Sequence, residues 1–285
     1  MSTPTMNNMV NNIPDPVSNV ASSIQAAANA GHLTPISSQT ILNNLNATTV
    51  PASIGDQISK METDIPIVLE LQIDESGSLE GYESVIVDAI NDTIDDFVRM
   101  RAKTGQEIYL RITVFSQRNG VPNVRVLQDY IHVQDCPKLT VADYRPNGMT
   151  PLNEAMYDGA TATSAFGATL FANGATGVQE VVIILSDGLD NPSGKPVRSL
   201  SEFRRLLLEL NTKPHFTFGF VGIGDEANFR AFALSAGVPD GNIVTVDKTK
   251  SGLTKAFKLI SSSMGSKSHS IQTGQTQSNQ TLFVV

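Results

Sequence analysis

The pentapeptide Asp74-Glu75-Ser76-Gly77-Ser78 brings one carboxylate and two hydroxyls together at alternate positions. It directly follows an apolar run at residues 65–73, so these side chains leave the end of a predicted buried strand. Closely spaced oxygen ligands suit Mg²⁺ or Mn²⁺, which favour octahedral coordination by oxygen. Asp and Ser are also common at turns and helix N-caps. The pentapeptide alone therefore leaves metal binding and helix capping equally open.

Two distant segments carry groups of the same kind. Asn147-Gly-Met-Thr-Pro-Leu152 places a Thr hydroxyl in a loop with Gly and Pro, and the segment 181–191 places Asp187 just after an apolar run. In order and local context, the three segments resemble the metal-ion-dependent adhesion site of von Willebrand factor A domains. The resemblance covers roughly residues 64–264.

The resemblance implies a complete ligand set and a way of using it. The implied metal ligands, some of them acting through water, are Asp74, Ser76, Ser78, Thr150 and Asp187. The implied ion is Mg²⁺ or Mn²⁺, with one coordination position left for a Glu or Asp of a partner protein. Glu75 stands where many members have a smaller or apolar residue, and we expect its side chain to point away from the ion. Met149 replaces a frequent Gly.

The middle of the chain alternates between strand and helix patterns. Strand patterns cover residues 67–73, 108–115, 124–133, 181–185, 215–221 and 242–246, and helical patterns cover about 80–102, 151–166, 200–210, 226–236 and 250–263. This order predicts an α/β fold with a doubly wound, mostly parallel central sheet flanked by helices. Ligands of such sheets bind beyond the carboxyl ends of the strands, where Asp74 and Asp187 both fall.

Composition divides the chain into three regions, with polar extensions at 1–62 and 265–285 around a domain at 63–264. The N-terminal extension contains short stripes of apolar residues at helical spacing, and Thr34-Pro35 is typical of a helix start. Stripes this narrow need another surface to cover them. We expect this extension to dock, on the domain or on a neighbouring subunit, through Ile41, Leu42, Leu45, Ile54 and Ile58.

Charge and cysteine content restrict the partners and the compartment. Twenty basic residues stand against 28 acidic ones, which gives a net charge of −8 and argues against nucleic-acid or anionic-membrane binding. Cys136 is the only cysteine, so the chain cannot form an intramolecular disulfide, as is usual in a reducing compartment. We find neither a secretory signal pattern nor a membrane-length apolar run. We therefore expect a cytoplasmic protein, or one within an assembled particle.

Other chemical motifs are weaker. Gly222-Ile-Gly-Asp-Glu-Ala227 matches a relaxed dinucleotide pattern, but it follows a late strand rather than the first. The segment 188–196 imitates a phosphate loop with the wrong spacing, and Pro196 occupies the position of the metal-binding hydroxyl. His132 precedes Cys136 by four residues, yet no Asn or Asp is placed to orient a catalytic pair.

These observations predict a non-enzymatic protein-interaction module that depends on a divalent metal and binds a partner's carboxylate. A weaker similarity links the chain to the short cytoplasmic members found in tellurium-resistance and stress operons. One alternative is a structural or assembly subunit, for example of a phage particle, with the domain as scaffold and the extensions as connecting arms. A second alternative is a metal-dependent hydrolase, which the sequence disfavours because no general base accompanies the five ligands.

Overall fold

A computed structural model describes residues 16–45, 61, 63–190, 198–213, 215–224, 226–274 and 281–283. Its centre is a six-stranded sheet in the order β3-β2-β1-β4-β5-β6. The strands are β1 (Ile67–Asp74), β2 (Ile108–Arg118), β3 (Val121–His132), β4 (Gln179–Ser186), β5 (Phe216–Ile223) and β6 (Ile243–Val246). All neighbouring pairs are parallel except β2 and β3. The predicted doubly wound, mostly parallel sheet is confirmed.

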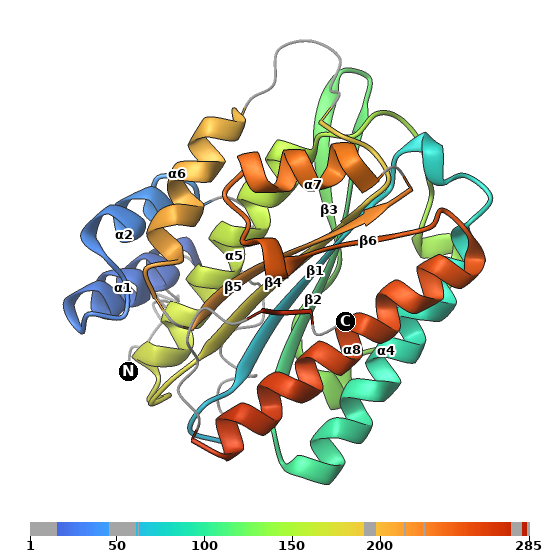
Figure 1. The fold of residues 1–285 in the computed structure, drawn as a ribbon. Helices are drawn as coiled ribbons and strands as arrows, with labels where there is room; N and C mark the ends of the chain where they lie inside the picture. Colours follow the sequence, from blue (N-terminus) through green and yellow to red (C-terminus); the bar gives the residue numbers. More distant parts are fainter. Residues whose placement is uncertain are drawn as a thin grey trace, which may run out of the picture.

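Helices cover both faces of this sheet (Figure 1). They are α1 (Pro16–Asn29), α2 (Pro35–Leu42), α4 (Glu83–Thr104), α5 (Leu152–Ala172), α6 (Leu200–Leu210), α7 (Glu226–Ser235) and α8 (Lys250–Gln272). Helices α4 and α8 lie on one face, while α1, α2, α5 and α6 lie on the other. None of the helices in the described part of the chain is long and apolar enough to cross a membrane.

The single antiparallel pair is a tight hairpin. Asn119 and Gly120 connect β2 to β3, and both have positive φ angles, 53° and 77°. Positive φ at both central residues defines a type I′ turn, whose twist matches that of the flanking strands. The sequence Asn-Gly thus fixes the register of this edge of the sheet.

Successive side chains of β1 point to opposite faces of the sheet, and the two faces differ in chemistry. Leu69, Leu71 and Ile73 pack into an apolar cluster with α4 and α8. On the opposite face, Glu70 is fully buried and accepts hydrogen bonds of 2.9 Å from the Arg111 guanidinium. Helix α5 brings Asp158 to 3.5 Å from the same guanidinium. A charged network therefore lies inside the domain, beneath α5.

The first two helices pack on the domain itself. Val20, Ile24 and Ile41 are almost fully buried in a cluster that also contains residues of α5, α6 and β5. Leu42 and Leu45 are partly buried against it. Of the residues predicted to dock this region, Ile54 and Ile58 lie outside the described part of the chain.

The C-terminal segment also contributes to the core. Helix α8 continues to Gln272, so the predicted end at Ser263 is wrong, because buried Met264 and Ser268 extend the inward face of the helix. Farther on, Leu282 and Phe283 are buried over β5, where a Cβ atom at Gly219 would lie 2.4 Å from Leu282.

Candidate metal centre

The ends of β1 and β4 meet at the carboxyl edge of the sheet. The two strands are parallel neighbours, with Ile73 paired to Leu185. The residues that follow, Asp74 and Ser186, lie side by side, and the Ser186 hydroxyl donates a 2.6 Å hydrogen bond to Asp74 Oδ2. Parallel pairing therefore brings together two motifs that are more than a hundred residues apart in the chain.

Four of the five predicted ligands form a chain of hydrogen bonds. Asp74 Oδ1 accepts from the Ser76 backbone N–H at 2.8 Å, and the Ser76 and Ser78 hydroxyls are 2.9 Å apart. The Ser78 hydroxyl then donates to Asp187 Oδ1 at 2.6 Å. Ser78 is exposed, so this chain reaches the surface of the domain.

The fifth predicted ligand, Thr150, is held beside the others by its loop. Met149 and Gln117 exchange backbone hydrogen bonds of 2.7 and 3.1 Å, which fasten the loop to the end of β2. Gly148 has φ = 84°, and a Cβ atom there would lie 2.0 Å from the Gln117 carbonyl oxygen, so only glycine fits. Thr150 is buried, and a Cβ atom at Gly188 would lie 2.9 Å from its hydroxyl oxygen. Thr150 therefore adjoins the residue after Asp187.

Burial destabilises the charged form of Asp74. The side chain is fully buried, and this raises the pKa of its carboxyl to about 6, although hydrogen bonds from Ser186 and Ser76 act in the opposite direction. The nearby Asp187 carboxylate adds to the rise. A bound cation would favour the ionised form, so protons and a metal ion would compete for this group.

The Glu75 side chain, which is not a predicted ligand, pairs with arginines and organises the Thr150 loop. Its buried carboxylate accepts hydrogen bonds from Arg118 at 3.1 Å, from Arg125, and from the Arg145 backbone N–H at 2.7 Å. The Glu75 carbonyl also accepts from the Asn147 N–H at 2.8 Å. The residue that departs from the usual motif thus ties the first motif segment to the second.

A lysine from a fourth loop, between β6 and α8, also reaches the site. The Lys248 Nζ atom lies 2.6 Å from Asp187 Oδ2, which is an ion pair by distance but lacks the geometry of a directed hydrogen bond. Sequence reasoning did not identify Lys248, Ser186 or the Tyr144 hydroxyl, which donates to the Asp74 carbonyl at 2.6 Å. Lys248 could have been predicted from its position in the sequence, because it follows the parallel strand β6 and so lies at the same carboxyl edge of the sheet.

The donor set fits a hard divalent cation. It combines hydroxyl and carboxylate oxygens on three loops, and these are the oxygen ligands that Mg²⁺ and Mn²⁺ prefer. The described residues contain no group of three or more His, Cys, Asp or Glu side chains able to hold a metal ion. A metal at this edge would thus rely on the hydroxyls of Ser76, Ser78 and Thr150 as well as on two carboxylates.

Three other titratable side chains in the described part of the chain are those of Asp190, Cys136 and His215. Asp190 accepts from the backbone and side-chain amides of Asn153, at 3.1 and 2.7 Å, and so caps the start of α5. Burial raises the pKa of the Cys136 thiol to about 11, which disfavours the nucleophilic thiolate. His215 packs edge-on against Phe171, and burial lowers its pKa to about 4.

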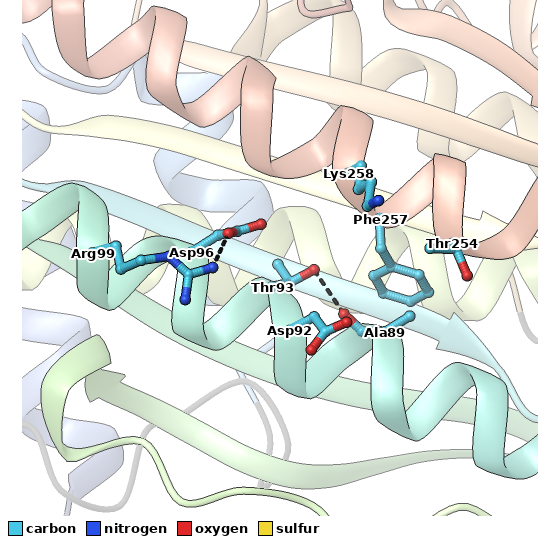
Figure 2. A pocket seen from close by; sticks show the side chains of 8 residues that line it. All are labelled: Ala89, Asp92, Thr93, Asp96, Arg99, Thr254, Phe257 and Lys258. Atoms are coloured by element: carbon cyan, nitrogen blue, oxygen red, sulfur yellow. Dashed lines mark hydrogen bonds and ion pairs between the residues drawn. The ribbon is translucent and has the colours of Figure 1, made fainter.

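A groove of about 250 Å³ lies between α4 and α8 (Figure 2). Its lining residues are Ala89, Asp92, Thr93, Asp96, Arg99, Thr254, Phe257 and Lys258. Thr93 donates to the Ala89 carbonyl at 2.9 Å, and Asp96 forms an ion pair with Arg99. These are ordinary interactions within a helix, so the groove is a weaker candidate than the carboxyl edge.

Comparison with solved structures identifies the fold. The SpaC pilus adhesin from Lactobacillus rhamnosus GG, in its open conformation, aligns with 73% of this chain and 31% of its own, at 11% identity and a TM-score of 0.53. Proximal thread matrix protein 1 from the mussel byssus, solved with a zinc-occupied MIDAS motif, aligns with 70% of this chain and 48% of its own, at 18% identity and a TM-score of 0.44.

The SpRpn10 VWA domain aligns with 67% of this chain and 93% of its own, at 11% identity and a TM-score of 0.45. No protein-family model and no curated protein matches the sequence. The adhesin and the byssus protein are matched over less than half of their length. The chain shares an α/β fold with the adhesin, and its doubly wound, mostly parallel sheet flanked by helices is as the sequence predicted.

Proposed function

We propose that this protein is a non-enzymatic interaction module that binds a partner's carboxylate through a divalent metal ion. The observation that carries the proposal is the hydrogen-bonded chain from Asp74 through Ser76 and Ser78 to Asp187. Thr150 lies beside it, against Gly188. Such a set of small oxygen donors on loops of a rigid sheet suits Mg²⁺ or Mn²⁺.

The charge of the site explains the preference for an acidic partner. Asp74 and Asp187 balance a divalent ion at most formally, contacts made through water weaken that balance, and the hydroxyl ligands add no charge, so the ion stays electrophilic. A partner's carboxylate at an open coordination position would form a charge-assisted bond that a neutral amide cannot match. Met149 and Leu189, 40% and 37% exposed, flank the loops of Thr150 and Asp187 and offer apolar contact around that bond.

The alternative of an assembly subunit with connecting arms is less well supported. Apolar residues of both predicted extensions, including Ile24, Ile41 and Phe283, are buried against the chain's own domain. The domain itself therefore covers these residues, and a second subunit is not needed to bury them. A cytoplasmic location stays a prediction, as does the similarity to stress-associated members of the family.

Metal calorimetry tests the proposal directly. Mn²⁺ and Mg²⁺ are titrated into the wild-type chain, Asp74→Ala and the control Asp92→Ala, which removes an exposed carboxylate from α4. We expect binding by the wild type and the control, and none by Asp74→Ala, with a cooperative unfolding transition in all three that shows each to be folded. A metal affinity of Asp74→Ala equal to that of the wild type would contradict the proposed metal site.

The partner side is tested by affinity purification with the same variants as bait. Proteins retained by the wild type should be lost in excess chelator and absent from the Asp74→Ala bait. The losses of binding caused by chelator and by Asp74→Ala should not add. Both remove the bond between the metal ion and the partner's carboxylate, which is worth a few kcal/mol. A set of retained proteins that is unchanged by chelator would show that binding uses surface contacts alone.

A further inference from the structure

Lys248 places a positive charge on one of the carboxylates of the candidate metal centre. It lies in the loop between β6 and α8, two strands away from β4 in the sheet. Its Nζ atom is 2.6 Å from Asp187 Oδ2, and the Asp187 side chain is fully buried. The other Asp187 oxygen accepts from the Ser78 hydroxyl. One carboxylate thus contacts both a predicted ligand and a lysine.

The backbone around Lys248 is fixed, so this contact is positioned by the fold. The Tyr82 hydroxyl, at the start of α4, donates to the Lys248 carbonyl at 3.1 Å. Thr249 caps α8 by accepting from the Gly252 N–H at 3.0 Å. The Lys248 side chain is 36% exposed and extends from this anchored loop toward Asp187. It can leave the carboxylate without disturbing the core.

We propose that Lys248 is an internal competitor of the metal ion, so that metal binding must release its ammonium group from Asp187. The inference rests on the proposed function. A lysine and a divalent cation that share the Asp187 carboxylate repel each other, most strongly when Asp187 holds the metal directly. Lys248 therefore weakens metal affinity.

Calorimetry with matched charge variants tests the competition. Lys248→Gln and the control Lys250→Gln each remove one positive charge, and Lys250 is exposed at the start of α8. We expect Lys248→Gln to bind Mn²⁺ about tenfold more tightly than the control, because the substitution removes a positive charge that repels the metal ion. Lys248→Arg, which keeps the charge, should bind like the wild type. Equal or weaker affinity in Lys248→Gln would overturn the inference while leaving the metal site in place.

A second measurement follows the lysine itself. Reductive methylation of Lys248, quantified by mass spectrometry, should be faster with Mn²⁺ than without it in the wild type and unaffected by Mn²⁺ in Asp74→Ala. A rate that Mn²⁺ does not change in a wild-type chain shown to bind Mn²⁺ would contradict release. If neither the wild type nor Lys248→Gln binds metal, the proposed function fails, and this inference fails with it.

Discussion

Two groups of buried carboxylates in this domain differ in what neutralises them. Beneath α5, Glu70 and Asp158 contact the guanidinium of Arg111, which is itself fully buried. At the carboxyl edge, Asp74 accepts hydroxyl and amide hydrogen bonds, and Asp187 contacts the solvent-accessible Lys248. The interior group has a permanent cation in a fixed geometry, whereas the edge group keeps oxygens that an exchangeable cation can use. Only the second arrangement is suited to binding.

Removing the interior cation should give the largest effect. Arg111→Met leaves the carboxylates of Glu70 and Asp158 buried without their cation, and we expect the free energy of unfolding to fall by about 3–5 kcal/mol. Chemical denaturation measures it. Arg99→Met is the control, because Arg99 forms an exposed ion pair with Asp96 and should contribute less than about 1 kcal/mol. Similar small losses in both variants would show that the interior network does not stabilise the fold.

The buried carboxyl of Glu180 differs from those of Glu70 and Asp158, because it accepts a hydrogen bond from the Ser164 hydroxyl at 3.3 Å rather than contacting Arg111. Burial raises the pKa of this carboxyl from 4.5 to about 8. The folded state then retains a proton that the unfolded state loses above pH 4.5. Stability should therefore fall as pH rises from 4.5 to 8, by at most about 1.4 kcal/mol per pH unit.

Glu180→Gln should remove most of this decline, as measured by urea denaturation across that pH range. The exposed Glu80→Gln serves as the control and should keep the wild-type slope. A Glu180→Gln curve parallel to that of the wild type would place the proton elsewhere.

A smaller effect is expected at the edge when the Thr150 loop loses its anchor. Glu75→Ala removes the acceptor of Arg118, Arg125 and the Arg145 N–H without removing a predicted ligand. We expect Mn²⁺ affinity to fall about 10–100-fold, as is typical when a group that orients ligands is lost. Calorimetry against Glu80→Ala, which removes an exposed charge nearby, isolates this role. Unchanged affinity would mean that the loop holds Thr150 without Glu75.

The sequence was sufficient for the strands of a mostly parallel sheet and for the expectation that the motif segments meet. Strongly apolar runs predicted the strands, and the rule that parallel strands end at one edge predicted that Asp74 and Asp187 lie together. The partners of Glu75 and Asp187 were not predicted, because long side chains such as Arg125 and Lys248 pair across the fold rather than along the chain. The end of α8 was missed for a similar reason, since its polar last turns are held by packing.

We propose that the hydroxyls and carboxylates at the carboxyl edge hold a divalent metal ion. Anomalous diffraction from crystals grown with Mn²⁺ tests it most directly, because the signal locates the ion itself. We predict a single strong peak within bonding distance of the Ser76 and Ser78 hydroxyl oxygens, with Lys248 moved away from Asp187. The absence of a peak at that edge, or a peak only in the groove near Asp92 and Asp96, would contradict the claim.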